Sequence, residues 1–351
     1  MQVLILTACL AAAPSDCAPR LLPAGIAPDA AGCEKSGDSR ADAWLAAHPD
    51  LTGKGWRCAP LAEAAALELT ELAPGVLVHR GADAAISAGN RGRIANLGVV
   101  VGTDRVAVID PGGSREQGEA LFAAIRGRTG LPVGPVILTH MHPDHIAGAE
   151  VFAEAGAEII SDARLPDALA ARRDSWMGSI PAQIGPDAWA GTTLIAPTRT
   201  IDAPETIDLG GTALTLTPAP TAHTDTDLTV ADSRSGTLFT GDLVFRGLTP
   251  VVDGSLKGWL GWMGGPHPAA ERVVPGHGPV AGSLDGAAAD TRAYLAALEA
   301  AVRGALDAGQ GLSQAVPAVV AALAPQRGDW ADFDATTARN AAAVYAELEW
   351  D

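Results

Sequence analysis

The chain has 351 residues, of which 48% are hydrophobic and 19% charged, a composition typical of a folded domain rather than a disordered or fibrous protein. The formal net charge of -17, with no Lys/Arg run longer than two residues, repels phosphate backbones and argues against a nucleic-acid partner. The length fits one large domain, or one domain with appendages.

The N-terminal residues contain an apolar stretch around Cys9 that is too short to span a bilayer, so we expect no transmembrane span. The stretch resembles the tail of a secretion signal, and Leu6-Thr7-Ala8-Cys9 resembles the lipoprotein box of bacterial envelope proteins, which would place a lipid anchor on Cys9. No Lys or Arg precedes it, so the alternatives are a start further upstream or a chance match. A signal would place the protein in the periplasm or outside the cell, and without one it would be cytoplasmic.

The remaining cysteines, Cys17, Cys33 and Cys58, also lie before the region that carries the histidine motif described below. In an exported protein they favour a disulfide such as Cys33 with Cys58. The alternative is free, buried thiols.

Three regions follow from composition and periodicity. Residues 1–65 are rich in Ala, Pro, Gly and Asp with little periodicity apart from a short helix near 41–47, and we interpret them as a signal-like segment with a cysteine-containing appendage. Residues 66–285 carry the strands and motifs of a catalytic domain. Residues 286–351 are predicted to be a helical extension packed on that domain.

Short apolar runs bounded by Gly, Asp or Pro predict strands at 76–79, 97–101, 106–109, 136–138, 158–160, 214–216, 228–230, 237–239 and 272–274. Helical spacing predicts helices at 115–128, 147–155, 290–305 and 336–348, the first of them capped by Ser114. Strands and helices alternate in the first half of the chain, which indicates an α/β protein.

A dense histidine motif follows the predicted strand at 136–138. It contains His140, His142, Asp144 and His145. In extended backbone the first two side chains point to one side, and the turn after them lets Asp144 and His145 face a second point. One short loop can thus serve two metal ions. A lone histidine is more often packed or solvated than a ligand, but four ligand-type residues within six positions favour a metal site.

Four further candidates stand where predicted strands end: Asp110, His223, Asp242 and His277. The edge of a sheet is where an α/β protein collects a site from distant segments. The joint pattern therefore favours one metal centre.

These motifs resemble the metallo-β-lactamase superfamily, in its glyoxalase-II-like branch. The resemblance implies a four-layer αβ/βα sandwich with extra C-terminal helices. It implies a first metal ion bound by His140, His142 and His223, and a second bound by Asp144, His145 and His277. Asp242 would bridge both ions, with Asp144 and Asp242 as the catalytic carboxylates. Asp110 would brace the histidine loop from behind the ligands, the alternative being a turn-capping role.

A closer resemblance covers most of the chain after residue 65. It rests on the stretches 223–230, 240–245, 253–260 and 345–350, which are similar to the quinoprotein relay system zinc metallohydrolases. This implies a periplasmic setting and an association with quinoprotein dehydrogenases. One departure is Thr226, which replaces the glycine of the usual superfamily pattern His-x-x-Gly, so the loop must close without it.

The expected activity is that of a dinuclear zinc hydrolase that uses a metal-bridging hydroxide to cleave an ester, thioester, lactone or amide-like bond of a small molecule. The ligand set also suits iron or manganese, because it lacks a thiolate. Asp242 stands where cysteine-containing β-lactamases place a thiol, so β-lactam hydrolysis is expected as a side activity at most. The alternatives are a mononuclear iron redox enzyme on the same fold, and a non-catalytic accessory that binds metal or a cofactor.

Substrate contacts are expected from loops at 176–189 and 245–262, which carry aromatic residues; the alternative for these is core packing. Lys257 is a candidate for a substrate carboxylate, with a solvated lysine as the alternative.

Overall fold

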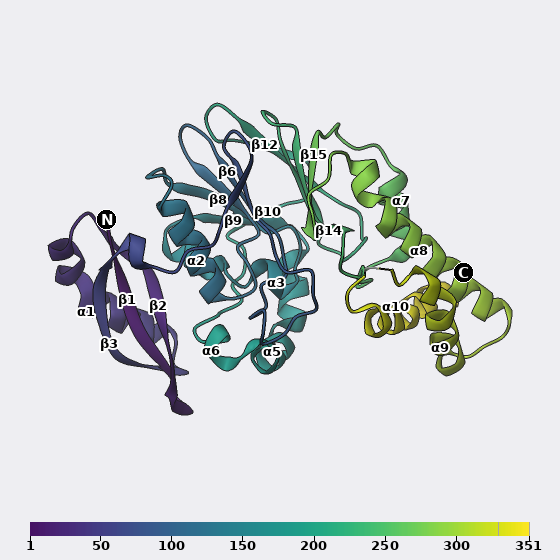
Figure 1. The fold of residues 1–351 in the computed structure, drawn as a ribbon, viewed down its shortest axis with the longest axis horizontal. Coiled ribbons are helices and arrows are strands. Elements are labelled where there is room, and N and C mark those ends of the chain that lie inside the picture. The colour runs from purple at the N-terminus through teal and green to yellow at the C-terminus, as the bar shows by residue number, and fades with distance from the viewer. Residues whose placement is uncertain (329, 351) are drawn as a thin grey trace.

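Two facing β-sheets with helices on their outer sides form the centre of the protein, as the computed structural model of residues 1–328 and 330–350 shows (Figure 1). The larger sheet has seven strands in the order β10-β9-β8-β7-β6-β5-β4. Its strands are β4 (Thr70–Ala73), β5 (Val76–His79), β6 (Leu97–Val101), β7 (Val106–Ile109), β8 (Val133–Ile137), β9 (Glu158–Asp162) and β10 (Arg199–Ile201). Strands β7 to β10 run parallel, so their carboxyl ends meet at one edge.

The second sheet has five strands in the order β11-β12-β13-β14-β15. They are β11 (Glu205–Asp208), β12 (Ala213–Pro218), β13 (Leu228–Asp232), β14 (Thr237–Phe245) and β15 (Arg272–His277). Strands β14 and β15 are parallel and the other pairs antiparallel.

A continuous apolar layer fills the space between the two sheets. Ile109 and Ile137 of the larger sheet share it with Leu214, Val230 and Phe239 of the smaller one, all at most 2% exposed. Both faces of the central strands are buried, which explains why they are nearly unbroken runs of Val, Ile and Leu.

Helices cover the outer face of each sheet. The larger sheet is flanked by α2 (Arg115–Arg126), α3 (Pro143–Ile146), α4 (Ala149–Glu154), α5 (Leu165–Ile184) and α6 (Pro186–Trp189). The smaller sheet is flanked by α7 (Leu256–Gly264), α8 (Leu284–Asp307), α9 (Leu312–Leu323) and α10 (Phe333–Leu348), which gather on the right in Figure 1. The order of layers is therefore helix, sheet, sheet, helix, as predicted. Within the described residues, no helix is both long enough and apolar enough to cross a membrane.

Residues 1–65, interpreted from their sequence as a signal-like segment with a cysteine-containing appendage, form a folded unit despite their low periodicity, and the helix expected near 41–47 is the end of a longer one. Strands β1 (Gln2–Leu10), β2 (Ala13–Ala27) and β3 (Leu51–Pro60) form a separate sheet with β1 at its centre, covered by α1 (Ala30–Ala47). The apolar run reflects burial on both faces of β1, because Leu4 and Leu6 pack with α1 and Val3 packs on the main domain.

Two disulfides join the four cysteines. Cys33 pairs with Cys58, as we predicted for an exported protein, and Cys9 pairs with Cys17. The Cys9 sulfur is thus bonded within the folded unit, and the structure gives no support to a lipid at that position.

Helices make up most of the first stretch expected to be a loop over the site and part of the second. Residues 176–189 belong to α5 and α6, and residues 256–262 to α7. Sequence periodicity missed α5 because only Leu165, Leu169, Ile180 and Ile184 of its 20 residues are buried and its polar face is broken by proline.

Candidate metal centre

All seven side chains predicted as ligands converge at the edge where the strands of the two sheets end. Strand β8 leads to His140 and His142, and α3 carries Asp144 and His145. The other three come from the smaller sheet: His223 from the loop after β12, Asp242 from β14, and His277 from the end of β15.

The side chains form two groups whose candidate ligand atoms lie within 4.8 Å of one another: His140, His142, His223 and Asp242 in the first, and Asp144, His145 and His277 in the second. Asp242 also faces the second group, since its carboxylate lies 3.2 Å from His145 Nε2 and 3.3 Å from His277 Nε2. It therefore stands between the two groups.

Distances between the donor atoms suit metal ligation. His142 Nδ1 lies 3.0 Å from His223 Nε2, and His145 Nε2 lies 3.4 Å from His277 Nε2. Ligand atoms at tetrahedral angles around an ion with bonds of about 2.05 Å stand about 3.3 Å apart. The spacing therefore fits small divalent cations.

Each of the five imidazoles uses its outward nitrogen for a hydrogen bond. His145 Nδ1 contacts Asp110 Oδ2 at 2.8 Å, and His142 Nε2 contacts Asp253 Oδ2 at 3.0 Å. The other three partners are the carbonyl of Val251 for His223 (2.7 Å), the carbonyl of Ile94 for His277 (2.9 Å) and Thr139 Oγ1 for His140 (3.0 Å). A proton donated outward leaves the inward nitrogen with a free lone pair, which is how metal-binding histidines are oriented.

Two buried atoms support this interpretation. His140 Nε2 and Asp242 Oδ1 belong to the small set of buried side-chain atoms in the described residues that have no hydrogen-bond partner. Buried polar atoms are nearly always satisfied, so such a pair pointing into one centre fits ligands of a cation.

Asp110 follows β7 with a left-handed backbone (φ 56°). Its Oδ1 accepts from the Thr139 amide at 2.8 Å, and its Oδ2 accepts from Thr139 Oγ1 at 2.7 Å as well as facing His145. One buried carboxylate thus fixes the start of the histidine loop and the orientation of one of its imidazoles.

In the metal-free protein, burial lowers the pKa of some of these histidines, and neighbouring carboxylates raise the pKa of the others. Burial lowers the pKa of His140 well below its usual value and lowers the pKa of His223 to about 3, so both rings are neutral. Burial also opposes charge on His277, but the carboxylates of Asp242 and Asp144 outweigh it and raise the pKa of His277 to about 10. The pKa of His145 is raised well above its usual value in the same way.

Asp144 shows the complementary effect. Its burial favours the neutral acid, but His145 and His277 beside it lower its pKa to about 2. The carboxylates of the centre are therefore ionised at neutral pH, in the state that a metal ligand requires.

Four residues have supporting roles that the sequence did not predict. Asp253 holds His142; Asn96 donates to the carbonyls of Pro275 and Gly278 on either side of His277, at 2.8 Å each. Gly276 gives room to Asp242, because a Cβ at that position would lie 1.8 Å from Asp242 Oδ1. Thr226 accepts a hydrogen bond from the Met141 amide at 3.1 Å. Each of the four is more than 25 positions from the residue that it supports, and local sequence patterns do not reveal contacts over that separation.

A cavity of about 720 Å³ opens onto the centre. Its walls come from α5, α10, the loop before β6 and the residues after β14, including Trp176, Ile180, Phe245, Thr336 and Arg339. Trp176 and Phe245, both from the stretches predicted to contact substrate, line it. Trp189 and Trp259 are buried in the core instead, and Lys257 is exposed outside the cavity lining.

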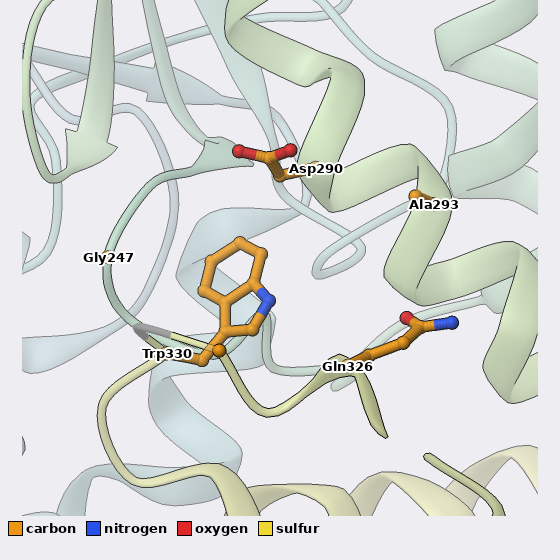
Figure 2. Close-up of a pocket in the computed structure, with 6 residues that line it drawn as sticks. Gly247, Asp290, Ala293, Gln326 and Trp330 are labelled. Atoms are coloured by element: carbon orange, nitrogen blue, oxygen red, sulfur yellow. The ribbon is translucent and has the colours of Figure 1, made fainter. Parts of the chain in front are cut away.

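A second cavity of about 360 Å³ lies between α8 and the segment before α10, and none of the described residues that line it also lines the first. Figure 2 shows the Trp330 indole reaching towards the helix that carries Asp290. None of the seven converging side chains lines this cavity.

Comparison with known proteins agrees with this architecture. The sequence model of the metallo-beta-lactamase superfamily matches residues 90–305, more than half of the chain. The chain belongs to the metallo-beta-lactamase superfamily, whose members are metal-dependent hydrolases. No curated protein matches the chain by sequence.

Solved structures share the fold at low identity. The stereoselective inverting sec-alkylsulfatase Pisa1 from Pseudomonas sp. aligns with a TM-score of 0.59 at 19% identity, over 80% of this chain and 50% of that protein. A metallo-beta-lactamase from Pontibacter korlensis aligns with a TM-score of 0.53 at 22% identity, over 66% of this chain and 99% of that protein. The chain thus spans about half the length of the alkylsulfatase.

Proposed function

We propose that this protein is a hydrolase with a dinuclear metal centre, in which His140, His142 and His223 hold one divalent ion, Asp144, His145 and His277 hold a second, and Asp242 contacts both. The observation that carries the proposal is the convergence of seven ligand-type side chains from both sheets, each imidazole already oriented by an outward hydrogen bond. Zinc suits this set of nitrogen and oxygen donors; iron and manganese are the alternatives.

Two bound zinc ions would supply an activated water nucleophile near neutral pH and would polarise the bond to be cleaved. The chain's own residues prepare the centre for this. Asp110 and Asp253 fix the rings of His145 and His142, and Asp242 places one carboxylate between the two groups. Such preorganisation means that the centre does not have to rearrange when substrate binds.

The cavity above the centre favours a small molecule with an apolar part. Its volume of about 720 Å³ lies within the range of small-molecule sites, and Ile86, Trp176, Ile180 and Leu248 contribute apolar surface. The bond cleaved is proposed to be an ester, thioester, lactone or amide-like bond. We include a secondary alkyl sulfate among the test substrates, because one structural neighbour is an alkylsulfatase.

The first test is metal content per chain, measured by plasma mass spectrometry on protein purified without added metal. About two zinc ions per chain would support the dinuclear hydrolase, whereas a single iron would favour the redox alternative. Hydrolysis of the substrate panel is then compared between the wild type, Asp242→Ala and the surface control Glu158→Gln. Turnover that is abolished only in Asp242→Ala would exclude a non-catalytic accessory protein.

We also propose a periplasmic setting linked to a quinoprotein system. Support comes from the resemblance of the stretches around His223 and Asp253 to the relay metallohydrolases, and from the pairing of all four cysteines in disulfides, which persist in oxidising compartments. Cell fractionation with thiol labelling tests this proposal. Reduced cysteines in a cytosolic fraction would contradict it. The proposal does not include a lipid on Cys9.

A further inference from the structure

Besides Asp110, a second carboxylate outside the seven ligands contacts one of their imidazoles. Asp253 lies in the loop between β14 and α7, and its Oδ2 is 3.0 Å from His142 Nε2, the nitrogen that faces away from His223. Its Oδ1 is 3.2 Å from Arg172 Nη2 on α5, so both carboxylate oxygens have partners. The Asp253 side chain is 33% exposed, which leaves the contact accessible to substitution without opening the core.

The same short segment holds a second histidine of the first group. The Val251 carbonyl accepts from His223 Nδ1 at 2.7 Å, and the Asp253 amide donates to the His223 carbonyl at 2.9 Å. Residues 251–253 therefore fix the orientation of both His142 and His223.

The second group has different supports. His145 is oriented by Asp110 after β7, and His277 by the Ile94 carbonyl before β6. Among the hydrogen bonds of the described residues, none joins the segment 251–253 to His145 or His277. The segment 251–253 thus supports the first group alone, whereas Asp110 contacts His145 of the second group and, through Thr139, His140 of the first.

The C-terminal helix holds the segment in place. Asn340 on α10 is 1% exposed; its Oδ1 accepts from the Val252 amide at 2.9 Å and its Nδ2 donates to the Pro250 carbonyl at 2.7 Å. Glu347, also on α10, accepts from Ser255 Oγ at 2.7 Å and from the Leu256 amide at 2.8 Å. The helical extension therefore reaches the metal centre through this loop.

We propose that Asp253 is a positioning residue for the first metal ion alone: it orients His142 within a loop that α10 anchors, and it leaves the second metal position independent. A carboxylate that accepts the outer N–H of a ligating imidazole fixes the tautomer and makes the ring a better donor. This inference rests on the proposed dinuclear site.

The test is a titration of metal-free protein with zinc ions in competition with a chromophoric chelator, which resolves two stepwise dissociation constants. In Asp253→Ala one constant is expected to weaken about 10- to 100-fold and the other to stay unchanged. Asp253→Asn should lose less, because the amide oxygen still accepts from Nε2–H. Arg172→Gln should also lose less, because it leaves the contact between Asp253 and His142 in place.

Glu158→Gln is the matched control, since Glu158 is an acid of 49% exposure that pairs with Arg199 on the far edge of the sheet. It should bind zinc as the wild type does. The positioning role would be overturned if Asp253→Ala weakened both constants equally or left both unchanged. Either result would leave the dinuclear site intact. A wild type that binds fewer than two zinc ions would overturn the proposed function as well. If Asp253→Ala fails to fold, the isosteric Asp253→Asn decides between these outcomes.

Discussion

Thr226 closes the loop after His223 at a position where the usual superfamily pattern has glycine. The usual superfamily pattern has glycine at this position, yet Thr226 does not lie in the left-handed region of backbone conformation. It is fully buried, and its hydroxyl accepts from the Met141 amide at 3.1 Å and contacts Thr224 Oγ1, also at 3.1 Å. The hydroxyl thus ties the loop of His223 to the histidine motif.

Thr226→Val keeps the shape of the side chain and removes that hydroxyl. The Met141 amide would be left buried without its acceptor, so we expect a loss of about 1–3 kcal/mol in the free energy of unfolding, measured by urea denaturation of metal-free protein. Thr206→Val, at an exposed position of β11, should change it by less than about 0.5 kcal/mol. Equal effects of the two substitutions would contradict the role assigned to the hydroxyl.

Gly276 is required for space rather than for backbone conformation, because its φ is not positive. In Gly276→Ala the new Cβ would meet Asp242 Oδ1 at 1.8 Å, so the carboxylate has to move away from its place between the two groups. We expect zinc per chain to fall from two to one or fewer, with a cost of about 1–3 kcal/mol from overpacking. Gly282→Ala, where a Cβ meets nothing within 4 Å, should retain full zinc content. Retained zinc in Gly276→Ala would show that the centre tolerates the shift.

At the scale of single residues, the sequence predicted those site residues that are close together along the chain or that follow a predicted strand. His140, His142, Asp144 and His145 fall within six positions, and their proximity could be read directly. Asp253 could not be found in this way, because its partner lies 111 positions earlier and an Asp-Gly pair ordinarily indicates a turn. Its role depends on the packing of α10, for which no local pattern exists.

At the scale of elements, three strands of the larger sheet were predicted with their bounds. The bounds 76–79, 97–101 and 106–109 agree with β5, β6 and β7, because Gly, Asp and Pro end each run. The N-terminal sheet was missed because a strand buried on both faces looks the same in sequence as the apolar core of a signal.

A buried ionic cluster joins the N-terminal unit to the main domain. Arg115 on α2 is 0% exposed and contacts Glu119, Glu150 and Glu154, at 2.8, 3.1 and 2.7 Å. Trp44 of α1 donates to Glu154 at 3.0 Å. The cluster therefore links α1, α2 and α4 through one guanidinium.

Arg115→Met would leave those carboxylates without their shared cation. Breaking a buried pair on one side typically costs about 3–5 kcal/mol, and we expect that loss in the free energy of unfolding from urea denaturation. Arg199→Met removes ion pairs with Glu158 and Glu205 in which every side chain is at least 35% exposed, and should cost less than about 1 kcal/mol. A loss below 1 kcal/mol for Arg115→Met would mean that the guanidinium is not needed to hold the N-terminal sheet and α1 on the rest of the protein.

At the scale of the whole molecule, the candidate metal centre connects the two sheets. His140 and His145 follow β8 of the larger sheet, whereas Asp242 and His277 belong to β14 and β15 of the smaller one. Metal ions bound between them would act as cross-links between the halves of the sandwich, and any ligand that binds only the folded state stabilises it. A free zinc concentration 100 times the dissociation constant would add about 2.7 kcal/mol.

That stabilisation is expected to increase with pH. In the metal-free protein the pKa of His277 is raised to about 10, against 6.5 in the unfolded chain, so its proton stabilises the metal-free fold fully below pH 6.5 and progressively less as pH rises towards 10. Zinc has to displace this proton and the one on His145, whose pKa is also raised. Lower pH therefore favours the protonated, metal-free protein, and higher pH favours the metal-bound one.

The measurement is the difference in Tm with and without zinc, at a fixed free zinc concentration, from pH 6 to 9. The difference should grow across this range in the wild type, and more steeply than in His277→Gln. A difference that is constant or shrinks would show that protons do not compete with zinc for these two histidines.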